Sequence, residues 1–165
     1  MRIATKSKSQ TQKFAAKLAK HILRKGPGAR ASIWALSGDL GAGKTTFTQG
    51  FIKALGVKHH VTSPTFLIVR RYPLGGQRSN VSFGEGSASG GKGQMFKDVY
   101  HFDLYRIHDP KEILSLGFKK IISNSQNIVL IEWPERIGKL LPKNTIWVYF
   151  SHSKKLNERK IILSL

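Results

Sequence analysis

Hydrophobic and polar positions repeat with two different periods along the first third of the chain. Apolar residues recur at helical spacing over 9–23, which predicts a first helix from about Ser9 to Leu23 with Ser9 or Thr11 near its cap. The short apolar run 32–37 has the length and composition of a buried strand. Helical spacing returns over 47–55, so a second helix is expected just after a polar, glycine-rich turn.

Later segments add several strands and one well-marked helix start. Asp109 is suited to an N-cap, Pro110 to the first helical position, and Glu112 completes a capping box. Short apolar or alternating runs predict strands at residues 65–72, 99–104, 127–132, 145–151 and 159–165. The last two are expected to pair as a hairpin. This mixture predicts an α/β fold, a three-layer sandwich whose central sheet is mostly parallel with antiparallel additions.

One long segment lacks the apolar side chains that a packed element needs. Residues 75–93 contain seven glycines together with serines. Such a stretch cannot bury enough surface to offset its ordering entropy, so we expect a flexible Gly/Ser-rich loop at about 75–97. The alternative is a binding loop that orders on contact with a partner. The total length of 165 residues suits one domain spanning 1–165.

Composition narrows the possible chemistry. The chain has no cysteine, which excludes disulfides, zinc–thiolate sites and thiol catalysis. No apolar stretch is long enough to span a membrane, and the basic N-terminus lacks the apolar core of a signal peptide. We therefore expect a cytoplasmic protein with no membrane association.

The charge balance is strongly basic, with a formal net charge of +19. A domain this basic is expected to attract polyanions. On the first predicted helix, four basic residues fall within about 60° of one face at 3.6 residues per turn; we call these the basic stripe, Lys13, Lys17, Lys20 and Arg24. The stripe is interpreted either as a solvated helix face or as a surface for RNA or an acidic partner.

The turn between the predicted strand 32–37 and the helix after it carries a phosphate-binding motif. Residues 38–45 read GDLGAGKT, a full match to G-x-x-x-x-G-K-[ST]. In this strand–loop–helix context, backbone N–H groups and the helix N-terminus point at phosphate oxygens. Lys44 can reach the β- and γ-phosphates, and the Thr45 hydroxyl can ligate Mg²⁺. The sequence therefore predicts a P-loop site for a nucleoside triphosphate.

A P-loop NTPase also needs an acid at the end of a hydrophobic strand, to hold Mg²⁺ or orient water. Glu132 ends a wholly apolar run and is the better candidate, while Asp103 ends a more mixed strand. Trp133 follows Glu132 directly and either flanks the nucleotide or belongs to the core. Thr65 lies where a switch threonine can meet Mg²⁺ and the γ-phosphate. The six histidines show no metal-ligand spacing and are interpreted as surface or structural groups.

Four blocks in series resemble one known family. They read SGDLGAGKTTFTQGF, TSPTFLIV, YHFDLYRI and IVLIEWPERI, at residues 37–51, 62–69, 100–107 and 128–137. In order and spacing these blocks resemble the TsaE family, small P-loop ATPases of bacterial tRNA threonylcarbamoyladenosine synthesis. The resemblance implies ATP and Mg²⁺ as cofactors. It also implies work with TsaD and TsaB, with TsaC acting upstream, on tRNAs that read codons beginning with A. Contact with tRNA would be direct or through that complex.

The same resemblance implies roles for individual residues. Asp103, Glu132 and Thr65 would be catalytic, as a Mg²⁺-linked acid, the Walker-B-type acid and the switch threonine. Thr45 and Glu132 would hold the metal. The nucleotide would contact Thr11 near the adenine, Trp133, and the P-loop residues Asp39, Leu40, Gly41, Ala42, Gly43, Lys44, Thr45 and Thr46.

Two other functions are compatible with the residues alone. A P-loop kinase of a small molecule or nucleoside would need a lid carrying arginines. The only long insertion contains Arg78 as its single arginine. A basic RNA-binding module with a vestigial P-loop is the other alternative, and the intact Lys44, Thr45 and Glu132 argue against it.

Overall fold

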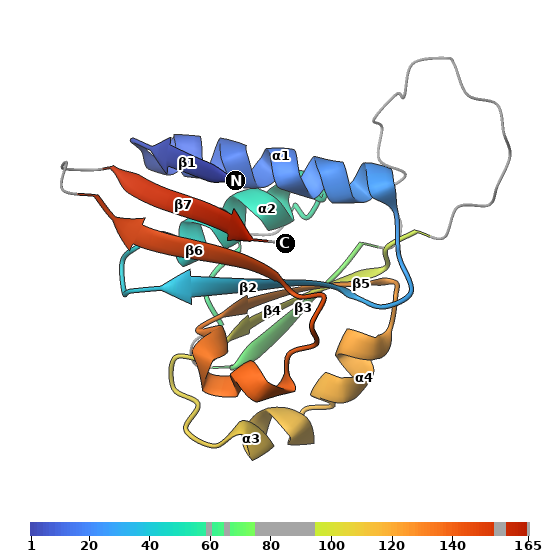
Figure 1. Ribbon diagram of the computed structural model, residues 1–165. Helices are drawn as coiled ribbons and strands as arrows, with labels where there is room; N and C mark the ends of the chain where they lie inside the picture. The colour runs from blue at the N-terminus through green and yellow to red at the C-terminus, as the bar shows by residue number, and fades with distance from the viewer. Residues whose placement is uncertain (59–60, 65–66, 75–94, 154–157, 165) are drawn as a thin grey trace, which may run out of the picture.

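The computed structural model describes residues 1–58, 61–64, 67–74, 95–153 and 158–164 (Figure 1). Seven strands form one sheet in the order β1-β7-β6-β2-β5-β4-β3. The strands are β1 (Arg2–Thr5), β2 (Ser32–Gly38), β3 (Val69–Pro73), β4 (Asp98–Asp103), β5 (Asn127–Glu132), β6 (Ile146–His152) and β7 (Arg159–Ser164). The helices are α1 (Lys8–Lys25), α2 (Lys44–Ala54), α3 (Pro110–Ser115), α4 (Phe118–Ser123) and the 3₁₀ helix η1 (Pro134–Leu140).

The middle of the sheet is parallel and its edges are antiparallel. Strand β2 pairs in parallel with β5 and β6, and β4 pairs in parallel with β5. Strand β7 is antiparallel to β6, β1 to β7, and β3 to β4. The predicted α/β class, with a parallel centre and antiparallel additions, is confirmed. The predicted C-terminal hairpin is the pair β6 and β7.

Helices cover both faces, which gives three layers (Figure 1). Successive residues of β2 point to opposite faces, so Trp34 joins the hydrophobic cluster under α1 and α2 while Ile33 joins the cluster under α3, α4 and η1. Gly50 lets α1 and α2 pack closely, because a Cβ there would lie 2.5 Å from the Cα of Gln12. These layers fix the carboxyl ends of β2, β4 and β5 at one edge.

The start of α1 differs from the sequence prediction. The N-cap is Ser7, in extended conformation, and its side chain accepts a hydrogen bond from the backbone N–H of Gln10. The helix begins at Lys8, one residue before the predicted start, and the cap is neither Ser9 nor Thr11. Thr11 is buried one turn later, where its hydroxyl lies 2.8 Å from that of Thr5. The hydroxyl of Thr11 therefore has a hydrogen-bond partner on β1. The local sequence pattern does not predict this contact between α1 and β1.

Other boundaries also shift. The strand predicted from residue 65 begins at Val69, because Leu67 and Ile68 both bond the Pro64 carbonyl in a turn and Ile68 has a φ of 63°. Residues 65–66 and most of the predicted loop, 75–94, lie outside the described residues. Neither β1 nor η1 was predicted, since each is short and lacks a clear period. Within the described ranges, the helices are too short or too polar to cross a lipid bilayer.

Candidate functional site

The P-loop connects the carboxyl end of β2 to the first turn of α2. Gly38, Gly41 and Gly43 have φ angles of 143°, 76° and 106°, in the region that favours glycine. A Cβ at Gly38 would lie 2.3 Å from the carbonyl oxygen of Phe150, so a side chain cannot fit there. The strand–loop–helix context expected for the motif is present.

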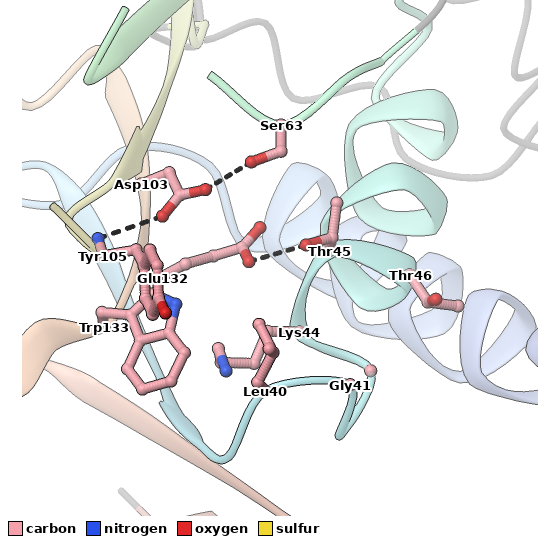
Figure 2. Close-up of a pocket in the computed structure, with 11 residues that line it drawn as sticks. Leu40, Gly41, Lys44, Thr45, Thr46, Ser63, Asp103, Tyr105, Glu132 and Trp133 are labelled. Carbon is pink, nitrogen blue, oxygen red and sulfur yellow. Dashed lines mark hydrogen bonds between the residues drawn. The ribbon is translucent and has the colours of Figure 1, made fainter. Parts of the chain in front are cut away.

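A pocket of about 360 Å³ opens beside this loop (Figure 2). Its lining comes from the P-loop, α2, the segment before β3, and the ends of β4 and β5. The lining residues are Leu40, Gly41, Gly43, Lys44, Thr45, Thr46, Ser63, Asp103, Tyr105, Glu132 and Trp133. The pocket thus gathers side chains that lie far apart in the sequence.

Lys44 lies folded against its own loop. Its ammonium donates to the carbonyl oxygens of Gly38 at 2.6 Å and Asp39 at 2.9 Å. The same nitrogen lies 3.8 Å from the centre of the Trp133 ring, a cation–π contact. Burial lowers the pKa of Lys44, and the carboxylate of Glu132 is the strongest influence in the opposite direction. The cation is therefore largely desolvated and held by uncharged partners, two carbonyl oxygens and an aromatic ring.

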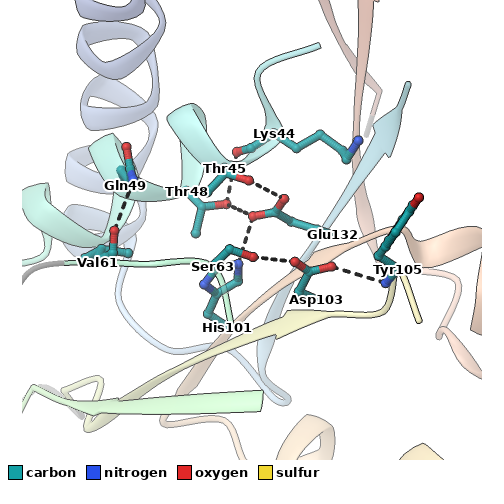
Figure 3. Close-up of polar contacts among 10 residues, drawn as sticks. All are labelled: Lys44, Thr45, Thr48, Gln49, Val61, Ser63, His101, Asp103, Tyr105 and Glu132. Atoms are coloured by element: carbon teal, nitrogen blue, oxygen red, sulfur yellow. Dashed lines mark hydrogen bonds and ion pairs between the residues drawn. The ribbon is translucent and has the colours of Figure 1, made fainter. Parts of the chain in front are cut away.

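The carboxylate of Glu132 is the centre of a buried polar network (Figure 3). The residue is 2% exposed, and every residue of β5 is buried. Its Oε2 accepts from the Thr45 hydroxyl at 2.8 Å. Its Oε1 accepts from the Thr48 hydroxyl at 3.3 Å and contacts Nε2 of His101 at 2.8 Å. Oε2 is thus directed toward the first turn of α2, while Oε1 is held by side chains from α2 and β4.

His101 supplies the contact that the sequence interpretation missed. Its side chain is fully buried, and Nδ1 has no hydrogen-bond partner in the described part of the chain. Nε2 faces a carboxylate oxygen, so the proton belongs on Nε2, from which it is donated to Glu132. From sequence the histidines are interpreted as surface or structural groups, and His101 agrees with the second of these, as a buried residue bonded to a candidate site acid. The available signal was alternation, since residues 101 and 103 point to the same face of a strand.

Asp103 lies next to Glu132 in the sheet register, at the end of β4. One of its carboxylate oxygens accepts from the Ser63 hydroxyl, and the other accepts from the backbone N–H of Tyr105 at 3.2 Å. The residue is 5% exposed. The two acids proposed from sequence therefore end neighbouring parallel strands and line the same pocket, as the rule for parallel sheets predicts.

Trp133 leaves β5 in a left-handed conformation, with a φ of 61°. This turn brings the indole alongside Tyr105, with 5.1 Å between ring centres, and over Lys44. The side chain is part of the pocket wall and is only partly buried. It also packs against the second hydrophobic cluster, while its contact with a nucleotide stays a prediction.

The remaining predicted residues fall into three groups. Thr46, Leu40, Gly41 and Gly43 line the pocket together with Lys44 and Thr45. Asp39 and Ala42 belong to the loop, and Thr11 to α1, but none of the three is part of the lining. Thr65 lies outside the described residues. For all of these residues, contact with a nucleotide stays a prediction, as does the switch role of Thr65.

The residue types in the pocket fit a magnesium–nucleotide complex. Among the described lining residues, Lys44 is the one cation, and it faces two carboxylates, Asp103 and Glu132. A triphosphate alone would be repelled by those carboxylates, whereas Mg²⁺ accepts their oxygens and the hydroxyl of Thr45. The described residues contain no cluster of three His, Cys, Asp or Glu that could hold a metal by itself.

Comparison with known proteins agrees with this geometry. A family model described as threonylcarbamoyl adenosine biosynthesis protein TsaE matches residues 5–161. A relative from Haemophilus influenzae, named tRNA threonylcarbamoyladenosine biosynthesis protein TsaE, is 38% identical over 68% of this chain and 58% of its own length. The protein of that name from Bacillus subtilis is 33% identical over 78% of this chain and 66% of its own length. The chain thus spans less than two thirds of the length of these two relatives.

Two further similarities extend over nearly the whole chain. The relative of the same name from Rickettsia prowazekii is 34% identical over 96% of this chain and 90% of its own length. The crystal structure of Bacillus subtilis YdiB superposes with a TM-score of 0.68 at 25% identity, covering 98% of this chain and 82% of that one. The fold agrees with the three-layer architecture described above. The chain belongs to the TsaE family.

Proposed function

We propose that this protein is an ATPase that supports TsaB and TsaD in forming threonylcarbamoyladenosine in tRNAs reading codons that begin with A. The observation that supports this most strongly is the hydrogen bond of 2.8 Å from the Thr45 hydroxyl to Oε2 of Glu132, in the pocket beside the P-loop lysine. The family membership supports the tRNA pathway. We place the activity in the cytoplasm because tRNA is the proposed substrate of the complex that this protein supports.

In this proposal ATP is bound by its phosphates. The glycine-rich loop and the first turn of α2 offer backbone N–H groups to the phosphate oxygens. Lys44 exchanges its two loop carbonyls for the β- and γ-phosphates, which requires a rotation of its side chain and no movement of the backbone. When the Lys44 ammonium leaves the Trp133 ring, that side of the pocket is uncovered for the nucleotide.

The metal site consists of Thr45 and Glu132. Bound Mg²⁺ would neutralise charge on the β- and γ-phosphates. The Thr45 hydroxyl, which now donates to Glu132, would turn its lone pairs to the ion, and the carboxylate would hold the ion or its water. Asp103, whose carboxylate is held by Ser63 and Tyr105, would orient the attacking water. Thr65 is proposed to be the switch threonine that meets Mg²⁺ and the γ-phosphate.

Hydrolysis by the protein alone should be slow. The described residues that line the pocket include no arginine. Lack of a transition-state cation slows P-loop enzymes by about 10³–10⁵-fold. We propose that contact with TsaB and TsaD supplies such a cation or orders the catalytic segments.

The test is nucleotide binding and phosphate release, measured with and without TsaB and TsaD. Lys44→Ala should abolish both, whereas Lys53→Ala, an exposed change on the same helix, should leave both near the normal level. Release of free phosphate with no phosphorylated small molecule separates this function from the kinase alternative. Unchanged ATP affinity in Lys44→Ala would show that the phosphate site is misassigned.

A further inference from the structure

One half of the sheet presents an open face. Strands β6, β7 and β1 pair so that Tyr149 lies opposite Ile162, and Ile162 lies opposite Arg2. Lys160 lies two residues before Ile162 on β7, and Trp147 two residues before Tyr149 on β6. All five residues therefore share one side of the sheet. We call this surface the open sheet face.

The open sheet face is not covered by any described helix layer. The hydrophobic cluster on this side of the sheet draws residues from β2, β4, β5, α3, α4 and η1, but none from the described residues of β1, β6 or β7. Figure 1 shows α1 and α2 on the other side of these strands. There Val148, Phe150 and Ile161 are buried, whereas Tyr149 is 43% exposed.

The aromatic pair on this face has the geometry of a stacking platform. The rings of Trp147 and Tyr149 are nearly parallel, at 12°, with centres 5.8 Å apart. Neither hydrophobic cluster of the core includes them. A planar ring that arrived from solvent could extend this stack, as bases do on the exposed aromatic side chains of sheet-based RNA-binding domains.

Charge selects among the possible occupants. Arg2 and Lys160 flank the aromatic pair and are exposed. The described residues of β1, β6 and β7 include no Asp or Glu, and no acidic residue precedes Asp39 in the sequence. On the neighbouring strand β2, Ser37 lies opposite Tyr149 and its hydroxyl is bonded to Glu135, so the border of the face with β2 carries an acid while its β1 and β7 side is basic. A mainly basic surface that carries planar aromatic groups fits a polyanion with planar groups of its own. That description is met by nucleic acid with unpaired bases.

We propose that the open sheet face binds single-stranded RNA, with bases stacking on Trp147 and Tyr149 and phosphates contacting Arg2 and Lys160. None of these residues lines the nucleotide pocket, so RNA and ATP can be bound together. RNA binding at this face does not require ATP hydrolysis. It is related to the proposed function only because tRNA has unpaired loops that could reach this face.

The first test compares a short labelled single-stranded RNA with its blunt duplex, by fluorescence anisotropy on the whole protein. Duplex bases cannot reach the aromatic pair, so the single strand should bind more tightly. Trp147→Leu and Tyr149→Leu keep apolar area but remove the stack, and each should weaken single-strand binding by about 5- to 150-fold. Trp147→Phe and Tyr149→Phe keep a ring and should retain most of the affinity. Unchanged ATP binding shows that each variant is folded.

A charge control separates this face from general attraction. Arg2→Glu with Lys160→Glu should weaken single-strand binding more than Lys17→Glu with Lys20→Glu, which makes the same charge change in the basic stripe on α1. Any of three results would overturn the proposal. These are equal losses of affinity in the two charge-reversed pairs, equal affinity for duplex and single-stranded RNA, and Leu variants that bind single-stranded RNA normally. Leu variants that lose only self-association or only binding to TsaB and TsaD would overturn it too, and would assign the face to a protein.

Discussion

Replacement of His101 tests whether Glu132 is held in place by its buried neighbours. In His101→Leu the side chain keeps a similar size but becomes apolar, so Oε1 of Glu132 loses the donor that lies 2.8 Å away. The oxygen keeps one partner, the Thr48 hydroxyl at 3.3 Å. Because Glu132 is 2% exposed, water cannot readily replace the lost donor.

The size of the effect follows from these contacts. A hydrogen bond to a charged group contributes about 1.5–3 kcal/mol, and leaving a buried acceptor short of partners costs a similar amount. For a chain of this length, each kcal/mol lowers Tm by about 2–4 °C. His101→Leu should therefore lower Tm by about 3–12 °C. Residues that orient a metal ligand typically change metal affinity or activity by about 10–100-fold, and we expect a loss in that range.

The assay measures three quantities on each variant: Tm, ATP affinity without metal, and the Mg²⁺ concentration that gives half-maximal turnover. Affinity without metal should stay near normal, because His101 does not line the pocket. The Mg²⁺ requirement should rise. His101→Gln places an amide N–H within reach of the same oxygen and should recover a large part of the loss.

Two results would refute this reasoning. If His101→Leu has a lower Tm but a normal Mg²⁺ requirement, His101 contributes to packing alone. If Gln and Leu behave alike in all three measurements, the contact between Nε2 and Oε1 does not position Glu132.

Three other predictions concern Glu132, Trp133 and Gly50. Glu132→Gln should retain ATP binding but lose more than about tenfold in turnover, measured as phosphate release, because the amide cannot replace the metal-binding charge. Mg²⁺–ATP should change the emission of Trp133, which now lies 3.8 Å from the Lys44 ammonium, and the change should be absent in Trp133→Phe; a signal that persists would come from Trp34 or Trp147. Gly50→Ala should cost about 1–3 kcal/mol in urea unfolding, since its Cβ would lie 2.5 Å from the backbone of Gln12. Gly138→Ala, where nothing lies within 4 Å, is the control, and equal losses would contradict the packing argument.

The sequence predicted what local patterns encode. The P-loop, the apolar strand before Glu132 and the Asp109 capping box depend on residues close together in the chain, and each is present in the structure. These features could be predicted because spacing within a few residues fixes their geometry. Asp103 and Glu132 are each expected from sequence to end a strand, but the pairing of β4 with β5 that makes them neighbours is a tertiary feature.

The contacts that the sequence did not reveal join distant segments. The bond between His101 and Glu132 spans two strands, and the pairing of Thr11 with Thr5 joins a helix to an unpredicted edge strand. The bond from Ser63 to Asp103 joins a loop to a strand end. Polarity at such positions indicates a cap or an exposed face when read locally. Only the tertiary structure shows that the group is buried and paired.

Charge is distributed in a way that links the pocket to the rest of the molecule. The protein carries +19 overall, yet the pocket places Asp103 and Glu132 against the single lysine of the P-loop. The long-range field of the protein favours polyanions, including nucleotides and RNA, whereas the carboxylates of the pocket disfavour a phosphate group that arrives without a cation. In the proposed function, the metal-bound nucleotide would therefore be preferred inside the pocket, at Thr45 and Glu132. RNA carries no such requirement, so the basic surfaces outside the pocket remain available to it while the site is occupied.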